Sequence, residues 1–224
     1  MAGPVALKAV VFDVGETLVD ETRLWSDWAD WLGVPRLTFL AALGAVIARG
    51  ADHREVFDLV CPGLDLGAEW ERRVAAGRAE PLGATDLYPD AVPCLVALRE
   101  AGYRLAIVGN QPSRTESILR GLPVPLAFAA SSETWGVTKP DPAFFERIAD
   151  ELALPPSEVA YVGDRVDNDI RPAAAAGMVA VFVRRGPWAW IQAGRSDPPE
   201  AALTVESLAD LPVALAASAA AASS

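Results

Sequence analysis

The fold is decided by the stretch Val10-Val11-Phe12-Asp13-Val14-Gly15-Glu16-Thr17-Leu18 near the start of the chain. Residues 6–12 form a short, Val-rich apolar run, which is typical of a strand that is buried on both faces. The run ends in Asp13, so a carboxylate is delivered to the carboxyl end of the strand. That position suits a nucleophile, whereas Gly15, two residues later, brings no side chain to the site.

Short apolar runs of the same kind alternate with amphipathic helical patterns along the rest of the chain. This alternation predicts an α/β fold: a Rossmann-like parallel sheet with helices on both faces. Ligands of such sheets bind outside the carboxyl ends of the strands. The expected strands after the first are 104–108, 126–129, 159–162 and 179–183, and the expected helices are 90–101, 113–120, 142–152 and 168–176.

Residues 19–84 break the alternation, because they contain helical patterns and no convincing strand. We expect a small helical cap domain here, inserted into a discontinuous core of residues 1–18 and 85–224. Its expected helices are 21–32, 36–48, 54–60 and 68–78. Trp25, Trp28 and Trp31 recur at helical spacing, which favours a packing face over a ligand site. The Ala/Ser-rich tail, 215–224, is expected to be frayed.

The composition excludes several classes of protein. The chain has 224 residues, of which 52% are hydrophobic and 22% are charged, so it can bury a full core. A net charge of −11 argues against nucleic acid or an anionic membrane as the main partner. The sequence contains no run of eighteen apolar residues, so no membrane span is predicted, and the N-terminus lacks a signal-peptide layout. Two isolated cysteines, Cys61 and Cys94, agree with a reduced, cytoplasmic protein. The sequence gives no indication of the oligomeric state.

Residues whose side chains could act in catalysis or metal binding follow several of the expected strands. Asp164 and Asp169, together with Asp13, offer hard oxygen ligands of the kind that Mg²⁺ prefers. Such an ion would reduce the repulsion between the nucleophile and an incoming phosphate.

Lys139 is one of only two lysines beside seventeen arginines, and a compact ammonium there would balance the charge of the nucleophile and of the phosphoryl oxygens. Asn110 would bind the substrate by donating a hydrogen bond to a phosphoryl oxygen. The four segments, in chain order, are Asp13-Val14-Gly15-Glu16-Thr17, Val108-Gly109-Asn110, Lys139-Pro140-Asp141-Pro142 and Val162-Gly163-Asp164-Arg165-Val166-Asp167-Asn168-Asp169.

With these four segments in this order, the chain resembles the haloacid dehalogenase-like (HAD) hydrolase superfamily over nearly its whole length. The resemblance implies that Asp13 forms a covalent aspartyl intermediate, that Lys139 matches the family's lysine, and that Asp164 and Asp169 match its acidic metal-binding pair. A helical cap inserted after the first motif, here 19–84, is also a family feature. We therefore predict a Mg²⁺-dependent phosphatase that acts on a small phosphorylated metabolite.

Two positions depart from the family's phosphatase pattern. Gly15 stands where these enzymes carry a second aspartate, which protonates the leaving group and later activates water. The backbone carbonyl of Gly15 can still bind the metal, but the lost general acid is worth roughly 10²–10⁴-fold in rate. We expect slow turnover of alkyl phosphates and relatively better turnover of acyl or aryl phosphates. Gly109 stands where the second motif carries Ser or Thr, so one phosphate-binding hydroxyl is missing.

Glu16 is a further acid in the same turn, one residue beyond the missing one. Adjacent residues on an extended chain point in opposite directions, so we interpret Glu16 as a solvated turn glutamate. The alternative is that its longer side chain swings inward and replaces the missing acid.

The departures leave two alternative functions open. A haloacid dehalogenase would tolerate Gly15, because a halide leaves without protonation, although the acidic pair would repel an anionic haloacid. A catalytically weak binding or regulatory protein on the same scaffold would tolerate both Gly15 and Gly109.

Overall fold

The predicted α/β class with a parallel sheet is confirmed by a computed structural model, which describes residues 6–79, 82–194 and 197–222. The sheet has the strand order β3-β2-β1-β4-β5-β6, and every neighbouring pair is parallel. All strands therefore end at the same edge, and β1, which leads to Asp13, lies between β2 and β4. The strands are β1 (Ala9–Phe12), β2 (Arg104–Gly109), β3 (Phe128–Ser131), β4 (Val159–Gly163), β5 (Val179–Val183) and β6 (Leu203–Val205).

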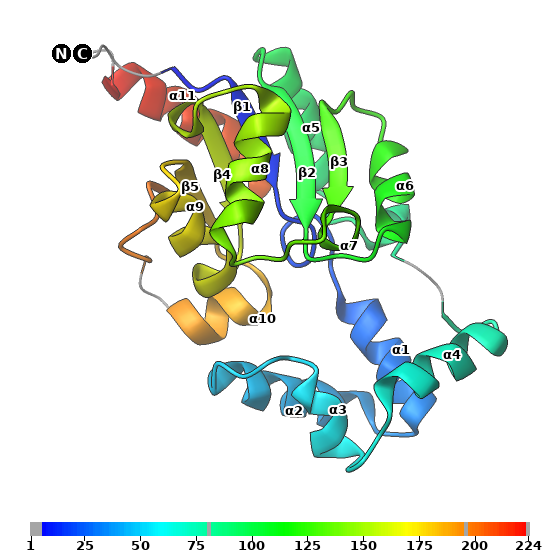
Figure 1. The fold of residues 1–224 in the computed structure, drawn as a ribbon. Coiled ribbons are helices and arrows are strands. Elements are labelled where there is room, and N and C mark those ends of the chain that lie inside the picture. Colours follow the sequence, from blue (N-terminus) through cyan, green and yellow to red (C-terminus); the bar gives the residue numbers. More distant parts are fainter. Residues whose placement is uncertain (1–5, 80–81, 195–196, 223–224) are drawn as a thin grey trace. The chain divides into compact units, whose positions relative to one another are not determined.

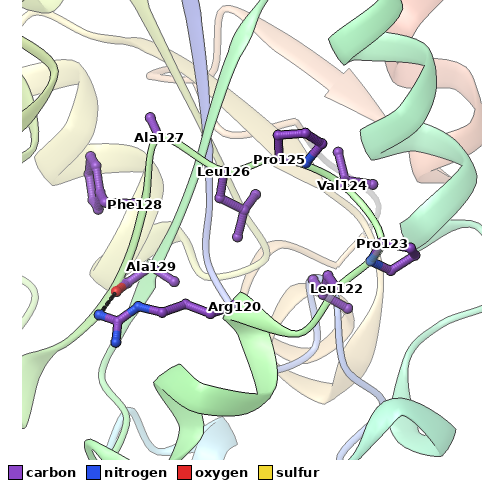
Figure 2. Close-up of a pocket in the computed structure, with 9 residues that line it drawn as sticks. All are labelled: Arg120, Leu122, Pro123, Val124, Pro125, Leu126, Ala127, Phe128 and Ala129. Carbon is purple, nitrogen blue, oxygen red and sulfur yellow. Dashed lines mark hydrogen bonds between the residues drawn. The ribbon is translucent and has the colours of Figure 1, made fainter.

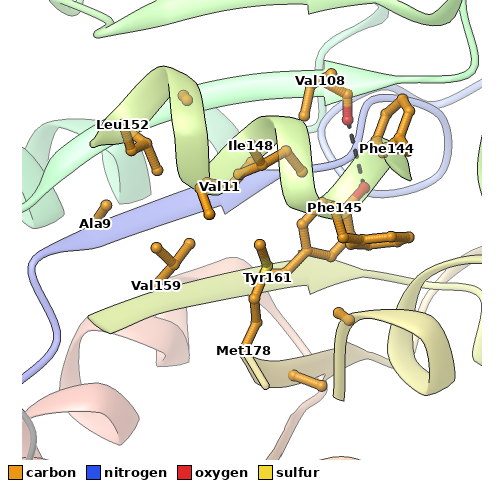
Figure 3. Close-up of a cluster of buried hydrophobic side chains, with 14 of the residues drawn as sticks. Ala9, Val11, Val108, Phe144, Phe145, Ile148, Leu152, Val159, Tyr161 and Met178 are labelled. Atoms are coloured by element: carbon orange, nitrogen blue, oxygen red, sulfur yellow. Dashed lines mark hydrogen bonds between the residues drawn. The ribbon is translucent and has the colours of Figure 1, made fainter. Parts of the chain in front are cut away.

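Helices cover both faces of the sheet, with α8 on one face and α5 and α11 on the other (Figure 1). The central strands β1, β2 and β4 are almost entirely apolar because both of their faces are buried, and the exceptions are the exposed Arg104 at the start of β2 and Tyr161 in β4. Val11 and Tyr161 belong to one face, where they pack under Phe145 and Ile148 of α8 (Figure 3). The helices of this part of the chain are α5 (Ala91–Glu100), α6 (Arg114–Arg120), α7 (Ser132–Trp135), α8 (Pro142–Leu152), α9 (Arg171–Ala175), α10 (Gly186–Trp188) and α11 (Leu211–Ala222).

The chain divides into two compact units, residues 1–20 with 87–224, and residues 21–86. The second unit is helical, as its sequence pattern predicts, and contains α1 (Thr22–Leu32), α2 (Arg36–Ala48), α3 (Glu55–Val60) and α4 (Leu66–Ala75). Trp25 and Trp28 are buried there among the rings of Phe39 and Phe57, so the tryptophan stripe is a packing face. The role of this unit as a cap stays a prediction.

The C-terminal part of the chain differs from our expectations in two places. The tail is not frayed over its described length, since α11 extends to residue 222, and Leu211 and Leu215 are fully buried. Residues 223–224 of the tail, like residues 1–5 at the N-terminus, lie outside the described residues. The sequence analysis also missed β6, whose three residues pair with β5 but are too few to give a periodic signal.

Within the described ranges, no single helix is long and apolar enough to cross a membrane. Only α1 and α2 taken together meet the length and composition criteria, and a bend of 116° separates them.

Candidate active site

Asp13 is the first residue after β1, at the carboxyl edge of the sheet. Its backbone N–H donates to the carbonyl of Val162 on β4 at 2.9 Å, which fixes the start of the turn that follows. The residue is 7% exposed, so its carboxylate is largely withdrawn from water and needs partners within the protein.

Lys139 supplies the cationic partner of Asp13 from the loop before α8. Its Nζ lies 2.6 Å from Oδ1 of Asp13 and 2.5 Å from Oδ1 of Asp169. Burial alone would lower the pKa of Lys139, but the two carboxylates outweigh burial and hold the pKa well above its usual value. The side chain is therefore a fixed ammonium that links the turn after β1 to the turn after β4.

Asn110, the residue after β2, holds the backbone of Lys139. Its Nδ2 donates to the carbonyl of Lys139 at 2.9 Å, and its Oδ1 accepts from the N–H of Lys139 at 2.8 Å. This pair of bonds fixes the segment from which the ammonium projects. The predicted bond from Asn110 to a substrate stays a prediction, and the second N–H of its amide is the group that could make it.

The acidic turn after β4 holds the other two carboxylates. Asp169 lies on one turn of π-helix, Val166–Ile170, and its Oδ2 accepts from the backbone N–H of Arg165 at 3.0 Å. Asp164 is 1% exposed, and its buried Oδ2 has no hydrogen-bond partner. Burial, with the neighbouring carboxylates, raises the pKa of Asp164 well above its usual value. Burial likewise raises the pKa of Asp169, to about 6, against the opposing effect of Lys139.

A divalent cation fits this arrangement. Asp13, Asp164 and Asp169 can each offer one oxygen, and these atoms all lie within 4.8 Å of one another. Buried polar atoms are normally satisfied, and a bound ion would satisfy the unpartnered Oδ2 of Asp164. The donors are hard oxygens, which suit Mg²⁺. Gly15 lies in the same turn as Asp13, and its carbonyl as a further ligand stays a prediction.

Gly109, the last residue of β2, packs directly against Asp13. A Cβ atom added to Gly109 would lie 2.6 Å from Oδ1 of Asp13 and 3.2 Å from Cγ2 of Val14. The carboxylate of Asp13 thus uses space that a side chain at position 109 would fill.

Our interpretation of Glu16 as a solvated turn residue is wrong. The side chain is 5% exposed, and its Oε2 accepts from the hydroxyl of Tyr88 at 2.6 Å. The extended-chain argument fails because Glu16 has a φ of 54°, in the left-handed region, which turns the side chain inward.

Two tyrosines contribute to this region and were missed by the sequence analysis. Tyr88 is the partner of Glu16, and nothing in its sequence context marks it. Tyr161 lies beneath Lys139, with its ring centroid 5.7 Å from Nζ, and its hydroxyl donates to the carbonyl of Val108 at 3.4 Å. A phenol inside an otherwise apolar strand, three residues before Asp164, is a signal that could have identified Tyr161.

A separate pocket lies away from these residues, at the start of β3. It is lined by Arg120 and by residues 122–129, and Nη2 of Arg120 donates to the carbonyl of Ala129 at its wall (Figure 2). Its other lining residues are Leu, Pro, Val, Ala and Phe, so it contains none of the candidate catalytic groups.

A family model described as haloacid dehalogenase-like hydrolase matches residues 7–177, a range that includes every residue of the site. The chain belongs to this family. It is 33% identical over 202 residues to a glyceraldehyde 3-phosphate phosphatase of Methanopyrus kandleri, covering 80% of this chain and 85% of the relative. The prediction of a HAD-type hydrolase is thereby confirmed, and its similarity to a phosphatase agrees with the predicted phosphatase type.

Solved HAD structures share the fold but do not separate the activities. One neighbour is a predicted phosphoglycolate phosphatase from Haemophilus somnus, with a TM-score of 0.66 and 22% identity, covering 92% of this chain and 96% of that chain. Another is a 2-haloacid dehalogenase from Pseudomonas syringae, with a TM-score of 0.59 and 23% identity, covering 94% and 99%. Because both types of enzyme match at similar levels, the activity has to be argued from the residues of the site.

Proposed function

We propose that this HAD hydrolase is a Mg²⁺-dependent phosphatase of small phosphorylated metabolites, with Asp13 as its nucleophile. The observation that carries the proposal is the pairing of Asp13 with Lys139 next to the unpartnered, buried Oδ2 of Asp164. A metal-free dehalogenase would use Asp13 as its nucleophile, but the charges of Asp164 and Asp169, without an ion, would repel an anionic haloacid.

In the proposed reaction, a carboxylate oxygen of Asp13 attacks the phosphorus atom, and the bond from phosphorus to the alcohol oxygen breaks. The product is an aspartyl phosphate, which water then hydrolyses to free phosphate and the original carboxylate. Lys139 holds Asp13 in place and balances the negative charge of the phosphoryl oxygens. The bound ion would be held by Asp13, Asp164, Asp169 and the carbonyl of Gly15, and it would supply further positive charge for the transferring group.

Gly15 places a limit on this reaction, because it leaves the alkoxide without a side chain that donates a proton. We expect the enzyme to favour phosphates whose leaving groups need little protonation. The relative named as a glyceraldehyde 3-phosphate phosphatase makes small sugar-type phosphates a class to test, and because these are alkyl phosphates we expect their turnover to be slower than that of acyl or aryl phosphates.

The test is turnover of p-nitrophenyl phosphate with Mg²⁺, with Mg²⁺ removed by chelation, and in Asp13→Asn. We expect turnover only with the ion, and a fall of at least about 10³-fold in the variant because the nucleophile is lost. Turnover that survives chelation would contradict the proposal.

Two further outcomes point to the alternative functions. Chloride released from 2-chloropropionate, without phosphatase activity, would indicate a dehalogenase. Ion binding without turnover of any substrate would indicate a binding or regulatory protein.

A further inference from the structure

Glu16 reaches across the carboxyl end of β4. It lies in the turn after β1, yet its side chain packs against Gly186, which follows β5: a Cβ atom on Gly186 would lie 2.6 Å from both Cβ and Oε2 of Glu16. β4 lies between β1 and β5 in the sheet, and Asp164 follows β4. Glu16 therefore flanks Asp164 on the β5 side of the site.

The structure holds Glu16 in this position at the expense of an unfavourable backbone conformation. Its φ of 54° is uncommon for residues other than glycine and asparagine. The hydroxyl of Tyr88 fixes the carboxylate, and Gly186, itself at a φ of 71°, leaves room for it. Strained residues that are held by their surroundings cluster at functional sites.

The charge of the site explains what a carboxylate here would do. Asp13 and Asp169 pair with the ammonium of Lys139, and Oδ2 of Asp164 has no hydrogen-bond partner. A fourth carboxylate beside Asp164 makes the cluster more negative and so increases its demand for a divalent cation. Mg²⁺ in proteins keeps several water ligands, and buried carboxylates around a metal site commonly orient such ligands.

We propose that Glu16 is a fourth carboxylate of the cation site, which strengthens ion binding through its charge and through the ion's water ligands, and that Tyr88 positions it. The inference rests on the cation site of the proposed function. Glu16 is then a positioning residue for the ion, in a chain that lacks the usual aspartate at position 15.

The experiment is a calorimetric titration of Mg²⁺ into the wild type, Glu16→Gln, Tyr88→Phe and the control Glu116→Gln. Glu116 suits the control because it is equally buried, at 6% exposure, and accepts bonds from Ser131 and Arg120 outside the site. We expect binding about 10-fold weaker in Glu16→Gln, about 3-fold weaker in Tyr88→Phe, and within about twofold of the wild type in the control. Melting temperatures establish that each variant is folded.

The outcomes separate this inference from the proposed function. Wild-type affinity in Glu16→Gln, or an equal loss in Glu116→Gln, overturns the role of Glu16 and leaves the phosphatase proposal intact. A wild type that binds no Mg²⁺ overturns the cation site itself, and both proposals with it. If Glu16→Gln does not fold, Tyr88→Phe decides: weaker binding supports the inference, and unchanged binding overturns it.

Discussion

Two polar clusters of the core unit, both near the ends of strands, differ in how their buried carboxylates are hydrogen-bonded and in the direction of the pKa shift. Asp90 accepts hydrogen bonds from Arg185, from the hydroxyl of Ser207 and from the backbone N–H of Leu208. Although burial alone would raise the pKa of Asp90, these bonds hold it below the usual value. Asp164 has a buried oxygen without a partner, and its pKa is raised.

The difference distinguishes a carboxylate that is satisfied within the fold, Asp90, from Asp164, which we propose to be a metal ligand. Asp90 has its partners within the chain, so its charge ties the loops after β5 and β6 to the start of α5. Oδ2 of Asp164 lacks such a partner, and in the proposed function the bound ion supplies the compensating positive charge. The same residue type thus stabilises one cluster and leaves the other ready to bind an ion.

The largest effects are expected when Asp164→Asn and Asp90→Asn are compared in unfolding free energy and in Mg²⁺ affinity. In the absence of Mg²⁺, Asp164→Asn should be as stable as the wild type or more so, because it removes a buried charge that has no partner. Asp90→Asn should lose about 2–3 kcal/mol of unfolding free energy, because Arg185 is left without its counter-charge. Mg²⁺ affinity should fall by about 10²-fold or more in Asp164→Asn alone. Denaturant unfolding and calorimetry measure the two quantities, and equal destabilisation by both changes would refute the distinction.

A second change adds a carboxylate next to the cluster of Asp13, Asp164 and Asp169. Gly15→Asp places a proton donor near the leaving group, so turnover of alkyl phosphates should rise by at least about 10²-fold. Turnover of aryl phosphates should rise less, because phenolate needs little protonation to leave. Steady-state kinetics on a matched alkyl and aryl pair measure the difference. Equal or lower activity on both, in a folded variant, would show that a missing acid is not what limits the enzyme.

A third change tests how tightly the nucleophile is held. Gly109→Ala puts a methyl group 2.6 Å from the present position of Oδ1 of Asp13, the atom that accepts from Lys139, so the carboxylate must shift. We expect kcat to fall by about 10²-fold, since small displacements of reacting groups have effects of that size. Gly83→Ala is the control, because its Cβ would have no neighbour closer than 3.9 Å. Unchanged kcat in Gly109→Ala would mean that the contact does not position Asp13.

The smallest expected effect is a dependence on pH. The pKa of Asp169 is raised to about 6, so in the ion-free protein the stability that this group contributes is lost as pH rises through that value. Mg²⁺ binds the ionised carboxylate, so its affinity should be about tenfold weaker at about pH 5 than at about pH 7. Melting temperatures with and without Mg²⁺ at the two pH values measure this difference. An equal stabilisation by Mg²⁺ at both would contradict the raised pKa.

Much of the site could be predicted from the sequence because most of its residues directly follow apolar strands or lie within one short interval of the chain. Asp13 and Asp164 each follow an apolar strand, and parallel strands bring such ends to one edge. The interval from Asp164 to Asp169 places both carboxylates on one short turn. Lys139 stood out because the chain otherwise uses arginine for nearly every cation.

Two features were missed for different reasons: one depends on tertiary contacts, and the other lies in an alanine-rich segment that was interpreted as frayed. Glu16 turns inward because Tyr88 and Gly186, both distant in sequence, hold and accommodate it. The helix α11 was read as low complexity, although alanine is the strongest helix former and Leu211 and Leu215, one turn apart, provide a face to bury.

The central claim is that Asp13 is the nucleophile beside a divalent cation. It is tested most directly by a crystal structure of the protein grown with Mg²⁺ and beryllium fluoride. We predict beryllium bonded to a carboxylate oxygen of Asp13, within reach of Lys139, and a metal ion held by Asp13, Asp164 and Asp169. An Asp13 that is unmodified and turned away from Lys139, with no ion among the three carboxylates, would contradict the claim.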